Sequence, residues 1–142
     1  MKIEVKRIKD KVHYQASNEQ GVLINMDGSE AIGGEGNGAR PMELLLAGLG
    51  GCAGIDISLM LDKMRQKADK VEMEINGERE ANAEPSLFQD IDIKFKFWGE
   101  LQAKHVLRAV ELSMTKYCSV AMTLNKSAKI SYQSYINDEL IK

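Results

Sequence analysis

Residues 33–52 read GGEGNGARPMELLLAGLGGC, and this segment decides how the chain of 142 residues folds. Its first half is a glycine-rich loop, and Pro41 then marks the start of a helix. A proline suits the first helical position, because the N–H that it lacks would have no partner there. Glu43 falls in the first turn, where the helix dipole favours a carboxylate. We predict a helix from residue 41 to about residue 66, with Cys52 near its middle.

The predicted helix is apolar on nearly every side up to Leu61, which is typical of a helix enclosed over most of its surface. Asp56 lies within this stretch and argues against a membrane span, since a carboxylate at mid-membrane costs about 2.5–3.5 kcal/mol. Small residues between Gly48 and Gly54 lower the helix propensity, by about 1 kcal/mol for each glycine relative to alanine. Such residues are tolerated where another backbone approaches closely, and we expect this partner to be a second central helix.

Apolar and polar residues alternate in several other segments, as they do in strands with one buried face. These segments lie near residues 3–5, 13–14, 22–26, 71–76, 91–98 and 127–135. A second helix is predicted over residues 101–117, where apolar residues recur at helical spacing. The order of strands, helix, two strands, helix and strand indicates an α+β fold. No linker or repeat interrupts the chain, so we predict one domain over residues 1–142.

Composition limits the classes of function. The formal net charge of −2 argues against a protein that binds nucleic acid or an anionic membrane, because such proteins need a basic patch. Residues 1–10 are charged and no apolar run follows them, so we expect no signal peptide and predict a cytoplasmic protein. The two cysteines are then free thiols, a redox pair or inert packing residues. Composition alone favours inert packing, because free cysteine is among the most buried residue types.

The chain shows neither a nucleotide loop nor a short metal-binding motif. The glycine-rich loop over residues 31–40 lacks the Gly-Lys-Ser/Thr ending of a phosphate-binding loop, so we interpret it as a flexible loop over a site or an interface. Cys52, Cys118, His13 and His105 could be imagined as four metal ligands, but no two of them are close in sequence, as zinc ligands usually are. We therefore predict no cofactor and no metal.

The chemical alternative to inert packing is a pair of reactive cysteines. Cys52 lies within the first predicted helix, and Cys118 ends the second, on or just past its apolar stripe. Two cysteines can bridge when their Cα atoms come within about 7 Å, which close packing of the two helices would allow. A thiolate that attacks peroxide becomes a sulfenic acid, and a second cysteine then condenses with it to a disulfide.

Residues 33–52, together with the later motif Tyr117-Cys118-Ser119-Val120, resemble the OsmC-like family, which includes the organic hydroperoxide resistance proteins. The resemblance implies an intertwined homodimer, in which strands of both subunits wrap around two central helices and the active sites lie at the subunit interface. It also implies that Cys52 is the peroxidatic cysteine and that Cys118 resolves it. The implied substrates are organic hydroperoxides, and the implied reductants are dithiols such as lipoylated proteins.

The chain departs from the family pattern at the residues that would activate the thiol. Met42 stands where the peroxidase members carry a glutamate, and Glu43 matches the next position instead. On a straight helix Glu43, nine residues before Cys52, points to the opposite side. The family's activating arginine lies in the N-terminal strands, and the candidates here are Arg7 and Arg40.

Two hypotheses follow. The first is a thiol-dependent peroxidase that reduces organic hydroperoxides in stress defence through Cys52 and Cys118. The second is a non-catalytic dimer that responds to stress or binds a small molecule, with unreactive cysteines. Met42 favours the second hypothesis. Asp56, one turn after Cys52, would also disfavour a thiolate there unless a cation paired with it.

Overall fold

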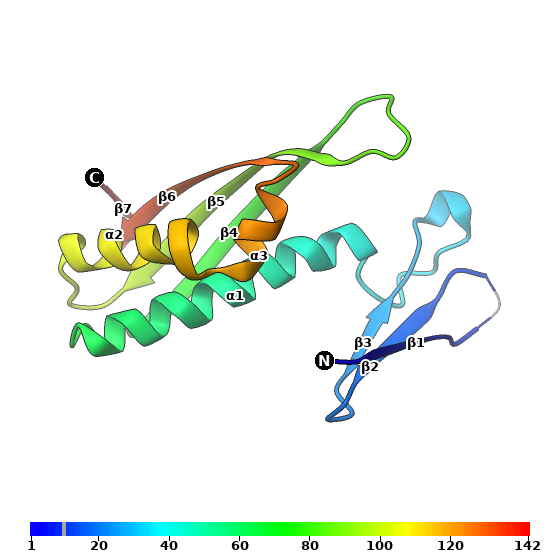
Figure 1. Cartoon of the computed structure of the whole chain (residues 1–142), viewed down its shortest axis with the longest axis horizontal. Helices are drawn as coiled ribbons and strands as arrows, with labels where there is room; N and C mark the ends of the chain where they lie inside the picture. Colours follow the sequence, from blue (N-terminus) through cyan, green and yellow to red (C-terminus); the bar gives the residue numbers. More distant parts are fainter. Residues whose placement is uncertain (10) are drawn as a thin grey trace. The chain divides into compact units, whose positions relative to one another are not determined.

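The computed structural model describes residues 1–9 and 11–142. The chain forms two compact units, Met1–Leu45 and Leu46–Lys142. Their boundary falls inside the long helix α1 (Pro41–Lys63). Figure 1 labels the helices and strands in chain order. The single domain over residues 1–142 stays a prediction.

The first unit is a three-stranded antiparallel sheet. Its strands, in order across the sheet, are β1 (Ile3–Arg7), β2 (Tyr14–Asn18) and β3 (Leu23–Met26). Among the described residues of this unit, only Ala16 and Asp27 are buried. Apolar strand residues stay exposed instead, with Ile3 at 52% and Leu23 at 57%. The three strands therefore bury almost no apolar surface among themselves.

The glycine-rich loop is organised around the buried carboxylate of Asp27. This carboxylate accepts hydrogen bonds from the N–H groups of Gly28, Glu35 and Asn37, at 2.8–3.0 Å. The hydrogen bonds, led by that from Asn37, hold the pKa of Asp27 below its usual value. A Cβ atom on Gly34 would collide with the carbonyl oxygen of Gly28, so the loop can close this tightly only with glycine there. The loop is thus more firmly hydrogen-bonded than its glycine content predicts.

Replacing Asp27 by alanine is expected to lower the thermal unfolding midpoint by on the order of several °C, because three N–H groups lose their acceptor. Asp27→Asn keeps an acceptor oxygen and should cost less. Since the folded pKa of Asp27 is lowered, its stabilisation is present above its ordinary pKa of about 3.8 and is lost as the pH falls through the lowered value. Calorimetry at neutral and acid pH measures both effects. Glu30→Ala, an exposed change in the same loop, is the control, and equal midpoints for both alanine variants would contradict the prediction.

The second unit contains a four-stranded mixed sheet. Its strands, in order across the sheet, are β4 (Lys70–Arg79), β5 (Phe88–Trp98), β6 (Lys129–Ile136) and β7 (Glu139–Ile141). The pair β4–β5 is an antiparallel hairpin, as the alternation predicts. The pair β5–β6 is parallel, because the chain between them crosses over through helices. These are α2 (Ala103–Leu112), the π-helical turn η2 (Ser113–Tyr117) and α3 (Ser119–Leu124).

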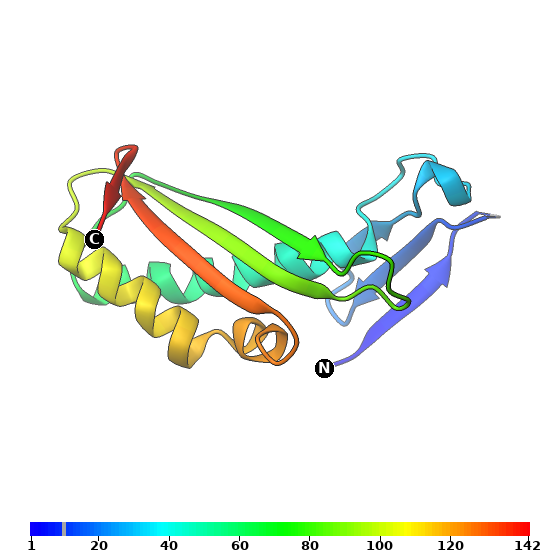
Figure 2. The same ribbon diagram turned by 90° about the horizontal axis from the view of Figure 1, so that it is seen from above.

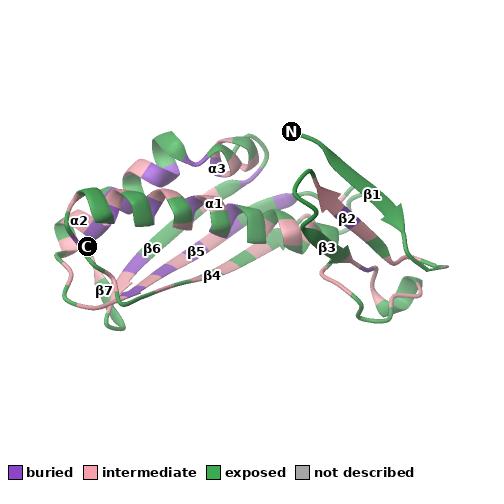
Figure 3. Ribbon diagram, turned by 90° about the horizontal axis from the view of Figure 1, so that it is seen from below, coloured by how far each residue is buried: buried purple, intermediate pink, exposed green. Residues whose placement is uncertain are grey.

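The helices cover one face of this sheet, as Figure 2 shows. Every second residue of β5 is buried on this face, including Ile91, Ile93, Phe95 and Phe97. The facing helix residues are also buried, and they are Leu49, Ala53 and Ile57 of α1 with Val106 and Val110 of α2. Figure 3 shows buried positions on the strands and helices of this layer, and exposed positions along the outer side of α1. By length and composition α1 could also cross a membrane, but this buried stripe makes it a core helix of the unit.

The prediction that a second helix packs against the small residues of α1 is wrong at two of the glycines. A Cβ on Gly50 would lie 2.9 Å from Ile75, and one on Gly54 would lie 2.8 Å from Met73. Both contacts come from β4, so these glycines make room for strand side chains and not for a second helix. A Cβ on Gly51 would meet nothing within 4 Å in this chain.

The helix boundaries also differ from the predicted ones. Helix α1 ends at Lys63, before the predicted end near residue 66. The second predicted helix covers α2 and η2, but its last turn is π-helical. Helix α3 and strand β7 were not predicted, since both are short and carry too few residues to show a period.

Candidate functional site

Three side chains of the second unit converge between α1 and the start of α3. They are Cys52, Asp56 and Cys118, whose two sulfurs and one carboxylate oxygen all lie within 4.8 Å of one another. Cys52 and Asp56 are four residues apart on α1 and therefore share a face. Both cysteines are free thiols; Cys118 is fully buried, whereas Cys52 and Asp56 are half-buried. The structure thus brings together the two cysteines that the sequence singles out.

The position of Cys118 depends on a break between two helical segments. After η2 its backbone is extended, with φ −69° and ψ 102°, and Cys118 becomes the N-cap residue of α3. Its Sγ accepts a hydrogen bond from the N–H of Ala121 at 3.4 Å, as a serine oxygen does in an ordinary cap. Its own N–H donates to the carbonyl oxygen of Ser113 at 2.9 Å. These two bonds hold the sulfur in one orientation toward α1.

Sequence reasoning missed Ser113, which helps to fix this geometry. Ser113 is fully buried, and its hydroxyl donates to the carbonyl oxygen of Ala53 at 3.5 Å. Ala53 is the residue after Cys52, so this contact ties the start of η2 to α1 beside the first cysteine. The available signal in the sequence was a serine next to the apolar stripe of the second predicted helix. A hydroxyl at such a position is expected to be buried and to need a hydrogen-bond partner.

The Cys118 thiol resists ionisation. Burial, and after it a hydrogen bond to the Cys52 sulfur, raise the pKa of Cys118 to about 11, although the N–H groups of Ala121 and Val120 oppose the shift. Cys118 therefore stays protonated at neutral pH and can donate to the sulfur of Cys52. Of the two, Cys52 is the less buried sulfur.

Asp56 adds an unusual feature to the pair. Its Oδ2 atom is buried and has no hydrogen-bond partner among the residues that the structure describes. Most buried polar atoms in proteins are hydrogen-bonded, so an unpaired one beside two thiols requires an explanation, such as a bound ion or water. A carboxylate at this distance also repels a thiolate on Cys52.

The other predicted site residues lie in the first unit. The carboxylate of Glu43 accepts a hydrogen bond from the backbone N–H of Arg40 at 2.9 Å, which caps the start of α1. This contact gives Glu43 a structural role. Arg7 is exposed at the end of β1. Catalytic roles for these three residues stay predictions.

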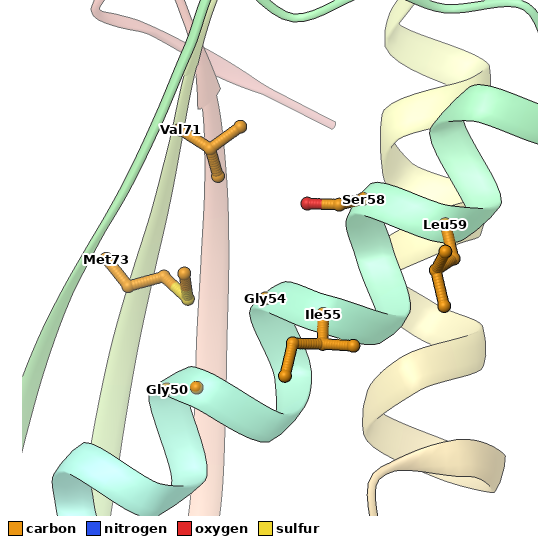
Figure 4. A pocket seen from close by; sticks show the side chains of 8 residues that line it. Gly50, Gly54, Ile55, Ser58, Leu59, Val71 and Met73 are labelled. Atoms are coloured by element: carbon orange, nitrogen blue, oxygen red, sulfur yellow. The ribbon is translucent and has the colours of Figure 1, made fainter. Parts of the chain in front are cut away.

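A pocket of about 500 Å³ lies beside α1 in the second unit, between this helix and β4 (Figure 4). Its wall is almost entirely apolar, and Ser58 is the one hydroxyl-bearing residue in it. Met73 extends from β4 toward α1 at Gly54, as Figure 4 shows. A pocket of this size and character suits an apolar small molecule or the side chains of another subunit.

Comparison with known proteins agrees with this architecture. The model of the OsmC-like protein family matches residues 34–133. The chain is 37% identical over 120 residues to Protein YhfA of Escherichia coli strain K12, a match that covers 84% of this chain and 86% of that protein. The family resemblance predicted from residues 33–52 is thereby confirmed.

Solved structures share the fold over nearly the whole chain. A hypothetical protein from Aquifex aeolicus superposes with a TM-score of 0.82 at 28% identity, covering 96% of this chain and 95% of that one. An organic hydroperoxide resistance protein OsmC from Legionella pneumophila superposes with a TM-score of 0.67 at 15% identity, covering 96% and 97%. At that identity the second likeness concerns the fold alone. The α+β prediction is confirmed.

Proposed function

Because this chain belongs to the OsmC-like protein family, we propose that it is a cysteine-based peroxidase that reduces organic hydroperoxides. The observation that carries the proposal is the approach of the Cys52 and Cys118 sulfurs to within 4.8 Å. A disulfide requires only a small further movement from this arrangement. The half-buried position of Cys52 leaves it open to a substrate, whereas Cys118 is enclosed.

In the proposed reaction the Cys52 thiolate attacks the terminal oxygen of the hydroperoxide. The S–O bond forms, the O–O bond breaks, and the alkoxide leaves and takes up a proton to become the alcohol. Cys52 is then a sulfenic acid, which the Cys118 thiol attacks with release of water to form the disulfide. A dithiol, such as the dihydrolipoyl group of a lipoylated protein, reduces this disulfide by exchange and is itself oxidised to a disulfide. A cytoplasmic location, where thiols are kept reduced, suits this cycle.

Stoichiometric oxidation tests the proposal. The reduced protein is mixed with one equivalent of cumene hydroperoxide, and its free thiols are counted before and after. We expect both thiols of each chain to disappear, and mass spectrometry of the digested protein to find a Cys52–Cys118 disulfide within one chain. Two thiols that survive an excess of peroxide would contradict the proposal.

The active form is proposed to be an intertwined homodimer with its sites at the subunit interface. Members of this family are typically dimeric. The first unit buries almost nothing by itself, and small sheets of this kind are rarely stable alone. In the second unit, Ile55 and Leu59 are exposed on α1 at 64% and 57%. A second copy of the chain would remove these apolar surfaces from water.

Asp56→Asn is expected to speed the reaction of Cys52 with peroxide several-fold. The substitution removes a negative charge close to the sulfur, and the effect is moderate because the half-buried site is partly screened by solvent. Stopped-flow measurement of sulfenic acid formation gives the rate. Asp62→Asn, an exposed change on the same helix, is the matched control. A slower Asp56→Asn variant would instead assign the carboxylate a helpful role in the step.

Two observations favour a second function. The apolar pocket beside α1 suits a small apolar ligand, and Met42 replaces the glutamate of the peroxidase pattern. The alternative is a dimer that binds such a ligand while its cysteines stay unreactive. Slow labelling of both thiols in the native protein, with no disulfide after mild peroxide, would support this alternative.

A further inference from the structure

We propose that the reduced cluster of Cys52, Asp56 and Cys118 binds a divalent cation of the zinc class, and that oxidation of the two cysteines releases it. The metal site itself does not depend on peroxidase activity, whereas the release step rests on the proposed Cys52–Cys118 disulfide. Among the described residues, the side chains of this cluster bring two sulfurs and one carboxylate oxygen within 4.8 Å of one another. It contains neither of the histidines considered from the sequence.

The chemistry of the three ligands selects the metal. Zinc is bound by cysteine sulfur and by carboxylate oxygen, and three protein ligands leave a fourth position for water. Two thiolates disfavour magnesium and calcium, which prefer oxygen ligands alone. A site with two sulfurs and one oxygen therefore fits zinc, or cobalt as its spectroscopic substitute.

The three ligand atoms lie only slightly too far apart to bind one metal ion. With Zn–S bonds of about 2.3 Å and a Zn–O bond of about 2.1 Å, neighbouring ligands of a tetrahedral site lie about 3.6–3.8 Å apart. The three ligand atoms now lie within 4.8 Å of one another, so side-chain rotations that move them by about 1 Å close the site. Cys52 and Asp56 are one turn apart on a long helix, and the N-cap bonds of α3 fix the backbone of Cys118. The ligands thus come from regular, hydrogen-bonded elements.

The unpaired oxygen of Asp56 is an independent observation that points to a cation. A buried Oδ2 without a donor is costly, and a bound cation would supply the missing partner. Salt bridges within the described chain involve other carboxylates and leave Asp56 free for this role. The N–H of Ala121, which already donates to Cys118 Sγ, would stabilise that sulfur as a thiolate ligand.

Binding and oxidation compete for the same electron pairs. Zinc binding displaces one proton from each thiol, and the two thiolates then donate to the metal. Formation of the disulfide by the hydroperoxide joins the sulfurs and removes both as ligands. Asp56 alone holds a cation weakly, so the ion dissociates. Bound zinc should in turn slow oxidation of the pair, because it occupies the thiolate that attacks peroxide.

The test is a titration of the reduced, metal-free full chain with Zn²⁺ in competition with a chromophoric chelator, and with Co²⁺ to detect thiolate-to-metal charge-transfer bands. We expect one ion per chain, and no such binding after stoichiometric oxidation by cumene hydroperoxide. Cys118→Ser and Asp56→Asn should each weaken binding at least tenfold, whereas Asp62→Asn should leave it unchanged. Circular dichroism confirms that each variant is folded.

The outcomes separate this inference from the proposed function. Absence of thiolate–cobalt bands, or unchanged affinity in Asp56→Asn, overturns the metal site, and peroxide can still form the disulfide in that case. If the metal binds but peroxide forms no disulfide, the site stands and the proposed peroxidase is wrong. Asp56→Asn is informative in both assays, because it should lose metal and gain peroxide reactivity.

Discussion

Cys52→Ser is expected to abolish peroxide reduction, with a fall in rate of about 10³-fold or more, because a serine hydroxyl is not ionised at neutral pH and no other thiol can take its place. Cys118 cannot substitute, since it is fully buried and its pKa is raised to about 11. The measurement is consumption of cumene hydroperoxide in the presence of a dithiol. Full activity of this variant would show that the peroxide reacts elsewhere.

Cys118→Ser should give a different result. The first step is preserved, so one equivalent of peroxide is consumed, but the sulfenic acid on Cys52 then persists. Dimedone should label it, and excess peroxide should oxidise it further to the sulfinic acid. Ser119→Ala, an exposed change at the neighbouring position, is the matched control and should cycle normally. Identical behaviour of the two cysteine variants would contradict the division into an attacking and a resolving thiol.

Ile55→Glu is expected to convert the proposed homodimer into monomers and, with it, to lower the proposed peroxidase activity strongly. Ile55 is 64% exposed in one chain and belongs to the apolar wall beside α1. If the second subunit covers this wall, a glutamate there is buried without a partner, which destabilises the interface severely. Sedimentation equilibrium measures the change in mass.

Two controls make this result specific. Ile55→Leu keeps the apolar surface and should remain dimeric, and Lys126→Glu changes an exposed charge outside α1 and should also remain dimeric. If Ile55→Glu keeps the mass of a dimer, this wall does not form the interface. The pocket then remains available for a ligand, which favours the small-molecule alternative.

The parts of the fold that sequence predicts well are those with a long, regular pattern. The proline and glutamate at the start of α1 locate its first turn, and the strict alternation over Ile91, Ile93, Phe95 and Phe97 identifies β5 with its buried face. The hairpin of β4 and β5 follows from two such patterns in succession. Each signal is local, so neighbouring residues suffice to read it.

The parts that sequence does not predict depend on contacts between distant residues. Small residues in α1 indicate a close approach, but only the fold shows that β4 makes it at Gly50 and Gly54. The apolar stripe of the second helix continues through Met114 toward Cys118, and periodicity cannot detect that the backbone turns there. The spacing of Cys52 and Asp56 places both on one face, yet the unpaired oxygen of Asp56 is visible only in three dimensions.

The hydrogen bond from the Ala121 N–H to the Cys118 sulfur links chemistry to conformation. Helix α3 is only six residues long, so this cap is a substantial part of what holds its first turn together. The proposed disulfide would draw this sulfur closer to Cys52 and so lengthen its hydrogen bond from that N–H. The short helix would then loosen as the thiols are oxidised and tighten as they are reduced. Residues 119–124, several of them exposed, would then differ between the proposed oxidised and reduced forms of the protein.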